Sequence, residues 1–355
     1  MKLLITGFFG KNNLGDDLML EFFCKNISKN NDVTLLLIYG DEIKFQLPDS
    51  VKIKRLPKIS KGKSLWIKYF HSIYYDKLYW IGGTCFTENA GDGLYKYMKI
   101  FKKRKKSYGY IGVGIGEIKS EIKIERTKEL LQNAELVTFR DKASYEYAKS
   151  ICTNENFFLC DDLVYLSLPN LKRVDYKKKA LVVSWRNLEK YISSNKQKEC
   201  IEILIEFIKK ISKNFNNIII MPVGDSIDIS INKKIYNKLL NNNLDADIEY
   251  LDDIDNDERI DLILSSKLYI CGRLHGIFLS ECNNINTIAI GYDNKIQIYL
   301  ESINKAEDLI YPEVFNIDKL YEIYKVNNPI DNKIIKDGYK KSLNNIELFK
   351  KFNEE

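Results

Sequence analysis

Short β-rich runs alternate with segments of helical periodicity through most of the 355 residues, and this alternation is the feature that most constrains the fold. It is typical of a parallel sheet wrapped by helices. The pattern lapses once, in a stretch rich in proline, asparagine and charge between Ser167 and Lys179, and then begins again. A chain of this length is about right for two domains of ordinary size. We therefore predict an α/β protein with two doubly wound, Rossmann-like domains that face each other across a cleft.

The lapse in the pattern sets the expected domain boundaries. We expect an N-terminal Rossmann-like domain over residues 1–168, a linker over 169–179, a second Rossmann-like domain over 180–317 and a closing helical tail over 318–355. In doubly wound sheets, ligands bind outside the carboxyl ends of the strands. The interdomain cleft is therefore the predicted binding site.

The cysteines and the N-terminus limit the class of protein. The seven cysteines are scattered without a Cys-x-x-Cys pair and lie mostly in apolar runs, so we expect reduced core residues rather than a zinc site or a redox dithiol. The chain starts directly in a strand pattern, without a signal peptide, and no apolar run reaches the roughly 18 residues that span a bilayer. We expect a cytoplasmic protein that requires no metal and no cofactor.

The net charge of +6 is unevenly spread, with lysines concentrated in the segments Lys52–Lys63 and Lys99–Lys106. One interpretation is a solvated surface. The other is a peripheral contact with anionic lipid at the inner face of the membrane, where each basic residue near the surface contributes roughly 1 kcal/mol. Neither segment carries the aromatic or zinc-binding pattern of a nucleic-acid module, so nucleic acid is not an expected partner.

A glycine-rich turn, Gly7–Asp17, lies between the first predicted strand and the first predicted helix. Its residues match neither the P-loop nor the dinucleotide fingerprint, and Asp16 and Asp17 place negative charge where a phosphate would bind. The loop therefore suits sugar hydroxyls better than a nucleotide. Two further glycine clusters end predicted strands, and three such clusters together predict that another group approaches the backbone closely. These clusters are Gly82-Gly83 and Gly112, Gly114 and Gly116.

Arginine and histidine follow predicted strands of the second domain. The stretch "LVVSWRN" places Arg186 after one strand, and "YICGRLHGIF" places Arg273, Leu274 and His275 between another strand and a helix. Guanidinium groups suit carboxylate and phosphate oxygens, and a helix N-terminus adds backbone N–H groups. Surface salt bridges for the arginines and a structural role for the histidine are the alternatives. The pattern indicates a pocket for a small, doubly charged anion, whereas His71, with aromatic neighbours at helical spacing, is interpreted as core or helix surface.

In order along the chain, these motifs resemble those of the polysaccharide pyruvyl transferases of bacterial exopolysaccharide, capsule and cell-wall synthesis. The similar stretches are "GFFGKNNLGDD", "WIGGTCF", "GVGIGE", "TFRDKASYEYAK", "DLVYL", "SWRN" and "GRLHGIFLSECNNINTIAIGYDNK". Thr84 stands where the family has a third glycine, and Glu117 and Asn286 stand where it has prolines. These departures bear on acceptor specificity more than on the reaction.

The resemblance implies a fold like that of GT-B glycosyltransferases and phosphoenolpyruvate as the donor. The pyruvyl group would pass to two hydroxyls of one sugar, in a surface polysaccharide or its lipid-linked precursor, forming a ketal and releasing phosphate. The expected donor-binding residues are Arg186, Arg273, Leu274, His275 and Lys295. An exposed lysine that merely starts a helix is the alternative for Lys295.

The resemblance also implies which residues carry the chemistry. His275 would protonate the methylene carbon of the donor beside Arg273, and Asp16 would serve the attacking hydroxyl, with Asp17 and Glu88 as further candidates for the base. The expected acceptor-binding residues, all from the N-terminal domain, are Asn13, Asp16, Asp17, Gly83 and Glu88.

Two other functions fit parts of the pattern. A GT-B glycosyltransferase that uses a nucleotide sugar would share the arginine pocket, but it needs a ribose-binding carboxylate late in the second domain, for which Glu281 and Asp293 are the candidates. A non-catalytic carbohydrate-binding or membrane-associated scaffold would give Arg273 and His275 no common task.

Overall fold

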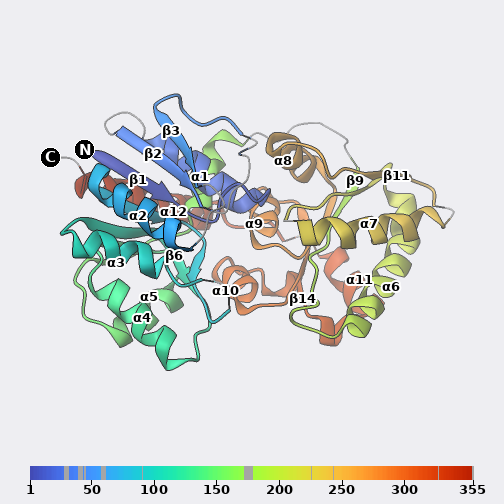
Figure 1. The fold of residues 1–355 in the computed structure, drawn as a ribbon. Helices are drawn as coiled ribbons and strands as arrows, with labels where there is room; N and C mark the ends of the chain where they lie inside the picture. The colour runs from blue at the N-terminus through green and yellow to red at the C-terminus, as the bar shows by residue number, and fades with distance from the viewer. Residues whose placement is uncertain are drawn as a thin grey trace. The chain divides into compact units, whose positions relative to one another are not determined.

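The computed structural model of the chain describes residues 1–27, 32–38, 43, 45–56, 61–89, 91–171, 179–224, 226–242, 244–326 and 328–353. The chain forms two compact α/β units (Figure 1). Unit 1 comprises Met1–Lys11, Asp16–Pro169 and Lys336–Glu355, and unit 2 comprises Asn12–Gly15 and Asn170–Ile335. Residues 172–178 of the predicted linker lie outside the described residues.

Unit 1 is built on a sheet of eight strands. These are β1 (Lys2–Thr6), β2 (Asp32–Leu37), β3 (Val51–Arg55), β4 (Lys77–Ile81), β5 (Thr84–Phe86), β6 (Ser107–Ile115), β7 (Leu136–Phe139) and β8 (Phe157–Leu159). The order is β3-β2-β1-β4-β6-β7-β8, with β5 paired to β6, and every pair is parallel. The order reverses direction between β1 and β4, which is the topological switch point where ligands bind in doubly wound sheets.

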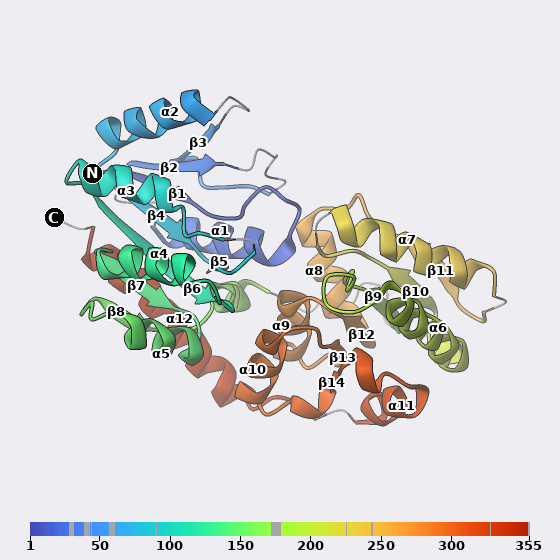
Figure 2. The same ribbon diagram turned by 60° about the horizontal axis from the view of Figure 1, so that its bottom comes forward.

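Helices cover both faces of this sheet. They are α1 (Leu14–Ile27), α2 (Lys61–Tyr74), α3 (Tyr95–Lys103), α4 (Glu121–Gln132), α5 (Lys142–Ile151) and α12 (Asn332–Lys351), with a 3-10 helix at Leu163–Asn170. Helices α2 to α5 pack in sequence order on one face, and α1 and α12 lie together on the other, as Figure 2 shows. The core is rich in tyrosine, and its phenols find backbone acceptors: Tyr108 donates to the carbonyl of Leu130 at 2.9 Å and Tyr110 to that of Gly93 at 2.8 Å.

The glycines of "GYIGVGIGE" lie differently from the prediction, because β6 does not end at Gly112 but continues to Ile115. Gly112 has a φ of +63°, and the register with β7 shifts between Tyr110 and Val113. Its N–H donates to the hydroxyl of Thr138 at 2.7 Å, and that hydroxyl also contacts Asn345 of α12. Gly112 is therefore an irregularity inside the strand, supported by a side chain from the end of the sequence.

The sheet of unit 2 has six strands in the order β11-β10-β9-β12-β13-β14, all parallel. They are β9 (Ala180–Ser184), β10 (Asn217–Ile220), β11 (Asp247–Tyr250), β12 (Leu268–Cys271), β13 (Asn286–Ile290) and β14 (Leu309–Ile310). The near-continuous burial of the four central strands is what a parallel sheet covered on both faces requires. The order reverses between β9 and β12, the switch point of this sheet.

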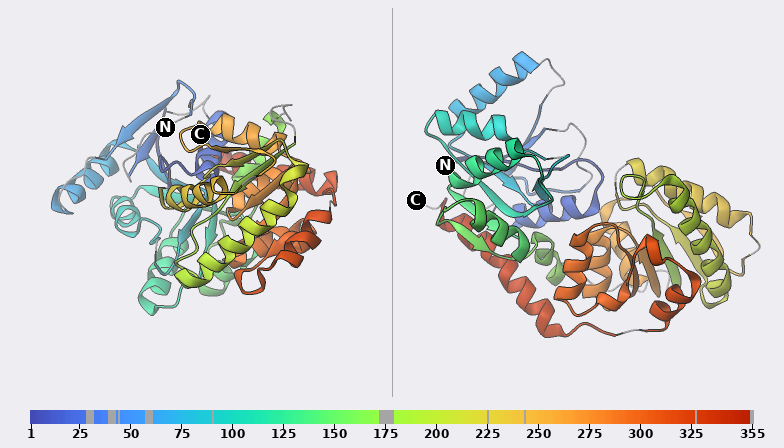
Figure 3. Two further views of the ribbon diagram at one scale, coloured as in Figure 1. Left: turned by 90° about the vertical axis from the view of Figure 1, so that its right-hand side faces the viewer. Right: turned by 90° about the horizontal axis from the view of Figure 1, so that it is seen from below.

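The helices of unit 2 also lie on both faces. They are α6 (Ser194–Ile211), α7 (Ser226–Leu240), α8 (Asn256–Ser265), α9 (Leu274–Cys282), α10 (Asn294–Ser302) and α11 (Ile317–Lys325). Helix α6 packs against α7 and α11, and α8 packs against α9, as the right-hand view of Figure 3 shows. Lys305 forms ion pairs with Glu281 of α9, at 3.6 Å, and with Asp308. All three residues are at most 6% exposed. Burial raises the pKa of the Glu281 carboxyl.

The predicted closing tail is divided between the units. Helix α11 belongs to unit 2, whereas α12 belongs to unit 1 from Lys336 onward. The reason is the apolar stripe of α12, whose Phe349 is fully buried against Phe23 and Tyr79, with ring centroids 5.1 and 4.9 Å away. Within the described ranges, none of the helices combines the length and the apolar character needed to cross a lipid bilayer.

Because Phe349 is buried between α1 and β4, we expect Phe349→Ala to destabilise unit 1 by about 3–5 kcal/mol, the range for removing a core phenylalanine. Lys340→Ala, at an exposed position of the same helix, should stay within about 0.5 kcal/mol of the wild type. Urea unfolding followed by circular dichroism measures both. Equal midpoints for the two variants would show that α12 is not part of the core.

Candidate active site

Four neighbouring strands of unit 2 end at one edge of the sheet, and each is followed by polar residues. Arg186 comes two residues after β9, Arg273 two after β12, Tyr292 two after β13 and Gly224 four after β10. Since β10, β9, β12 and β13 are adjacent and parallel, these residues share the carboxyl edge around the switch point. The sequence pattern alone predicted this position for the two arginines.

Arg273 is held by an acidic residue that the sequence analysis did not single out. Its Nε lies 2.7 Å from Oδ2 of Asp228, whose side chain is 2% exposed. The other carboxylate oxygen of Asp228 accepts the backbone N–H of Asn187 at 3.0 Å, so one buried carboxylate holds both Arg273 and the loop after β9. A Cβ on Gly224 would lie 2.2 Å from Asp228 Oδ2 and 2.5 Å from Arg273 Nη2, so only glycine leaves room for this pair.

Helix α7 holds the same loop at a second point. Asn232, fully buried and one turn after Asp228, accepts the N–H of Trp185 at 2.9 Å and donates to the carbonyl of Trp185 at 2.7 Å. The backbone on both sides of Arg186 is therefore fixed by α7. The Asp–x–x–x–Asn spacing of these two residues on one helix face is the signal that could have identified them.

Arg186 lies against two tyrosines. Its Nη1 donates to the hydroxyl of Tyr292 at 2.5 Å and its Nη2 to that of Tyr191 at 3.0 Å, while the guanidinium sits 3.9 Å from the ring centroid of Tyr292. Burial raises the pKa of Tyr292 to about 12, and Arg186 and Arg273 both act against that rise. Both guanidinium charges therefore act on the same phenol, which supports the predicted convergence of the arginines.

His275 lies in the first turn of α9, directly after Arg273 and Leu274. Gly15, from the opening glycine-rich turn, approaches it so closely that a Cβ there would lie 1.6 Å from Nδ1 of His275. The backbone N–H of Leu14 also donates to the carbonyl of Val223, at 3.3 Å. The sequence predicted that another group approaches the backbone of this turn. At Gly15 the approaching group is the side chain of His275.

Asn13 is the predicted acceptor residue whose position differs most from expectation. It lies in the segment Asn12–Gly15, which belongs to unit 2, and its neighbour Asn12 accepts a hydrogen bond at 2.8 Å from the fully buried Arg259 of α8. The turn is thus bound by residues of the second unit. Asn13 was expected to bind the acceptor as part of the N-terminal domain, and its place in unit 2 does not favour that role.

Lys295 is partly exposed at the start of α10. Its Nζ lies 5.3 Å from the ring centroid of Tyr292 and 3.9 Å from Oδ2 of Asp293, the residue that caps the helix. Lys295 is therefore near the tyrosine that Arg186 contacts. Its role as a donor ligand stays a prediction.

The predicted residues of unit 1 gather at the switch point of the first sheet. Asp16 and Asp17, in the first turn of α1, are 8% and 3% exposed. A Cβ on Gly83, which follows β4 with a φ of +70°, would lie 3.4 Å from Oδ1 of Asp16. Asp16 and Gly83 therefore meet where the strand order reverses, and Asp17 lies in the same helical turn as Asp16.

Arg140, which follows β7, is a further candidate that the sequence analysis did not assign. Its side chain is 8% exposed, and it donates to Asp162 at 3.0 Å and to the hydroxyl of Thr84 at 2.8 Å. Burial acts to lower its pKa, but Asp162, Asp141 and Asp16 outweigh burial and raise the value. The family motif around "TFRD" contained this residue, although its role could not be inferred without the surrounding carboxylates.

Glu88 has a structural explanation. Its carboxylate accepts the backbone N–H groups of Lys119, at 2.8 Å, and Ser120, at 3.0 Å, at the start of α4. These hydrogen bonds lower the pKa of Glu88 to about 2. A carboxylate with so low a pKa is a weak base, so this arrangement favours a helix-capping role over the predicted contact with the acceptor.

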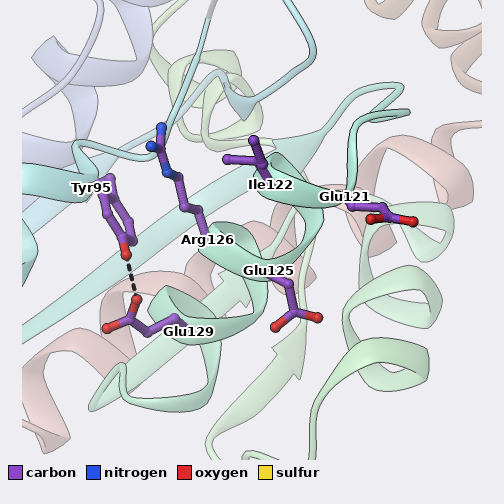
Figure 4. A pocket seen from close by; sticks show the side chains of 6 residues that line it. All are labelled: Tyr95, Glu121, Ile122, Glu125, Arg126 and Glu129. Carbon is purple, nitrogen blue, oxygen red and sulfur yellow. Dashed lines mark hydrogen bonds between the residues drawn. The ribbon is translucent and has the colours of Figure 1, made fainter.

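A hollow of about 620 Å³ lies elsewhere on unit 1, between Tyr95 and α4, and Figure 4 shows the side chains that line it. It is open to solvent, and the groups that line it pair with one another: Tyr95 donates to Glu129 at 2.5 Å, and Arg126 lies 5.1 Å from the centroid of the Tyr95 ring. We assign no site to it. Across the described residues, no group of three or more histidine, cysteine, aspartate or glutamate side chains is arranged to hold a metal ion.

The fold is similar to that of solved sugar-nucleotide enzymes. UDP-N-acetylglucosamine 2-epimerase from Rickettsia bellii has a TM-score of 0.63 at 12% identity, covering 99% of this chain and 96% of that one. The UDP-GlcNAc 2-epimerase of Methanocaldococcus jannaschii gives 0.63 at 14%, covering 96% and 98%. Sucrose-phosphate synthase from Thermosynechococcus elongatus gives 0.55 at 11%, covering 98% and 94%. The two parallel sheets therefore have the GT-B-like arrangement of elements that the sequence predicted.

The sequence identifies the family within that fold. The profile of the polysaccharide pyruvyl transferase family matches residues 13–294, which include both switch-point loops of unit 2 and the turn at Gly15. No curated protein matches the sequence at a significant level. The chain belongs to the polysaccharide pyruvyl transferase family and is a transferase of polysaccharide synthesis.

A pH-dependent stability measurement distinguishes the two possible roles of Glu88, which are capping of α4 and contact with the acceptor. Because its folded-state pKa lies below the ordinary value of about 4.3, its stabilising effect is present above that pH and is lost as the pH falls toward 2. We expect Glu88→Gln to lower the melting temperature at pH 7, and the difference from wild type to shrink as the pH falls through this window.

Glu117→Gln is the matched control, because Glu117 is 75% exposed on the loop whose Lys119 and Ser120 N–H groups Glu88 accepts, and it should change the melting temperature little. Thermal melts between pH 7 and pH 2 measure both variants. A Glu88→Gln protein with wild-type melting at all pH values but a raised KM for a sugar acceptor would place Glu88 in the acceptor site instead.

Proposed function

We propose that this transferase moves the pyruvyl group of phosphoenolpyruvate to two hydroxyls of one sugar residue, in a bacterial surface polysaccharide or its lipid-linked precursor. The product is a pyruvate ketal, and phosphate is released. The observation that carries the proposal is the meeting of Arg186, Arg273 and His275 at the carboxyl edge of the second sheet, in a chain of this family.

The donor fits the charges at this edge. Phosphoenolpyruvate carries a carboxylate and a phosphate, and planar guanidinium groups bind such oxygens through paired hydrogen bonds. Arg273 donates from Nε to Asp228, and its Nη2 lies 2.5 Å from where a Cβ on Gly224 would be. The backbone N–H of Leu274 and the N-terminus of α9 add donors for an anion. We therefore assign Arg186, Arg273, Leu274, His275 and Lys295 to the donor.

The reaction requires three proton transfers and two attacks on the same carbon. His275 gives a proton to the methylene carbon, which becomes a methyl group while an oxocarbenium centre forms at the neighbouring carbon. One sugar hydroxyl attacks this centre and loses its proton to a base, for which Asp16 is the candidate. The carbon–oxygen bond to phosphate then breaks with its electron pair on phosphate, the second hydroxyl attacks, and its proton leaves with the phosphate. No redox step and no metal ion is needed.

The acceptor is assigned to the first unit. Carboxylates and small backbone turns bind sugar hydroxyls by accepting and donating hydrogen bonds, and Asp16, Asp17 and Gly83 supply both kinds of group at the switch point of that sheet. Arg140 and Thr84 lie beside them and supply further donors. Because Thr84 replaces a glycine of the family, its hydroxyl is our candidate for a determinant of acceptor choice.

The rival donor, a nucleotide sugar, finds less support. Of the two carboxylates that could bind a ribose, Glu281 is 1% exposed and paired with Lys305, and Asp293 caps α10 through the N–H of Lys295 at 3.2 Å. Both carboxylates are thus engaged in the fold. The similarity to UDP-sugar epimerases is at 14% identity or below and concerns the arrangement of elements.

A binding measurement tests the donor. Phosphoenolpyruvate in the presence of EDTA should raise the melting temperature through mass action, because it binds the folded state alone, and the free energy gained is about 2.7 kcal/mol at a concentration of 100 times Kd. Arg186→Ala should abolish most of the shift. Stabilisation by UDP but not by phosphoenolpyruvate would instead support a glycosyltransferase, and a shift that requires magnesium would contradict the metal-free mechanism.

Steady-state kinetics tests the division of roles. His275→Gln should retain donor affinity and lower kcat by about 10²–10⁴-fold, the usual contribution of a general acid. Arg273→Ala should weaken donor binding by about 1.5–3 kcal/mol, and Arg273→Lys should restore only part of it because an ammonium has no planar fork. Gly15→Ala should resemble His275→Gln, since the added methyl must displace the imidazole.

The result that would contradict this assignment is a His275→Gln enzyme with near-normal turnover. The other histidine is not available to supply the proton, because His71 is 3% exposed and its ring contacts the hydroxyl of Tyr97.

A further inference from the structure

Helix α2 carries an apolar face that unit 1 leaves exposed. Its six residues lie in two rows at i, i+4 and i+8, which places them on one side of the helix. They are Leu65 (53% exposed), Trp66 (65%), Tyr69 (40%), Phe70 (60%), Ile73 (48%) and Tyr74 (55%). Scattered apolar residues are common on protein surfaces, but a continuous stripe of this kind marks an interaction site.

The opposite face of α2 fixes the helix on unit 1. His71, Ser72 and Tyr75 are at most 3% exposed, and His71 contacts the hydroxyl of Tyr97 on α3. Burial, with a smaller contribution from Lys54, lowers the pKa of His71 to about 4, so this contact is uncharged at neutral pH. The exposed stripe therefore belongs to a helix that is already folded and packed. Figures 1 and 2 show α2 on the outside of unit 1.

Cations lie around the stripe. Arg104 donates to the hydroxyl of Tyr69 at 3.1 Å and stacks on that ring, and Lys2 lies 4.0 Å from the centroid of the Tyr74 ring. The edge strand β3 adds exposed basic side chains, and the end of α3 adds more. The exposed residues are Lys52, Lys54 and Arg55 on β3 and Lys102, Lys103 and Lys105 around the end of α3, where Lys106 is half-buried. Of these lysines, Lys52 pairs with Asp32 and Lys106 with Asp76.

We propose that the exposed face of α2 docks unit 1 onto an anionic lipid bilayer. A helix lying in the membrane interface typically presents aromatic and aliphatic residues on one face with cations beside them. Tryptophan and tyrosine suit this depth because one end of the ring is apolar and the other is polar. Anionic headgroups complement the basic border, whereas a second copy of this chain would bring the same cations against it.

The docking surface differs from the one expected from the lysine-rich segments alone. Of the segment Lys52–Lys63, the side chains of residues 57–63 lie outside the description. Lys52 and Lys54 contribute to the basic border, while α2 supplies the apolar contact. An apolar contact should persist at salt concentrations that screen the lysines. If the acceptor is lipid-linked, which rests on the proposed function, docking brings unit 1 to the surface that holds the acceptor.

Trp66 allows a direct test in the full-length protein. The other two tryptophans, Trp80 and Trp185, are 6% and 1% exposed, so Trp66 at 65% dominates any solvent-dependent change in emission. We expect the emission to shift to shorter wavelength on adding phosphatidylcholine vesicles that contain phosphatidylglycerol, and less with phosphatidylcholine alone. The change should disappear in Trp66→Phe and should remain in part at high salt.

The variant Phe70→Glu/Ile73→Glu keeps Trp66 as the probe and places charge in the stripe. It should lower the partition coefficient for the anionic vesicles by at least about tenfold, since two large apolar side chains no longer leave water. Ile122→Glu is the matched control, because Ile122 is 66% exposed on α4 and should not affect partitioning. Both variants should keep the wild-type melting temperature and the wild-type activity on a soluble glycoside.

Three results would overturn the docking proposal. They are unchanged Trp66 emission with anionic vesicles, wild-type partitioning of Phe70→Glu/Ile73→Glu, and an emission shift that grows with protein concentration without vesicles. The last would assign the face to a second copy of the chain, which analytical ultracentrifugation would confirm. Vesicle binding needs no catalysis, so a protein that binds vesicles but transfers no pyruvyl group would refute the proposed reaction and leave the docking intact.

Discussion

The buried carboxylate of Asp228 organises the second unit's site. A charge that is 2% exposed must be compensated, and here Arg273 and the backbone N–H of Asn187 do so from two different strand ends. The pairing explains the position of Arg273, the conformation of the loop that carries Arg186 and the need for glycine at position 224. Removing one partner would leave the other charge buried alone, which is why we treat the pair as a single unit of the site.

The two sheets have the same strand order around their switch points, but they carry different kinds of candidate residue there. In each, the strand order reverses between the first and fourth strands in chain order, and the loops after those strands carry the candidate residues. In unit 1 these loops supply Asp16, Asp17 and Gly83, and in unit 2 they supply Arg186 and Arg273. The candidate residues of the first edge are carboxylates and a glycine, whereas those of the second are guanidinium groups.

Much of this could be predicted from the sequence, because parallel sheets leave a strong pattern. Apolar runs followed by glycine or arginine marked the strand ends, and the order of the motifs marked the family. The contacts made across the fold left no such trace. Asp228 lies 45 residues before Arg273, and Asn232 lies 47 residues after Trp185. Their spacing places them on one face of α7, but it does not indicate which residues they contact. For the same reason, the approach of Gly15 to His275, the capping role of Glu88 and the return of α12 to unit 1 required the structure.

The proposed reaction is the transfer of a pyruvyl group from phosphoenolpyruvate to a sugar. The most direct measurement incubates the protein with phosphoenolpyruvate and a panel of aryl or lipid-linked glycosides, and follows the sugar by mass spectrometry and free phosphate by a colorimetric assay. Pyruvyl transfer predicts a sugar product heavier by one pyruvyl ketal, formed with an equal amount of phosphate and absent with Arg273→Ala. Glycosyl transfer from a nucleotide sugar, with no ketal formed from phosphoenolpyruvate on any acceptor, would contradict it.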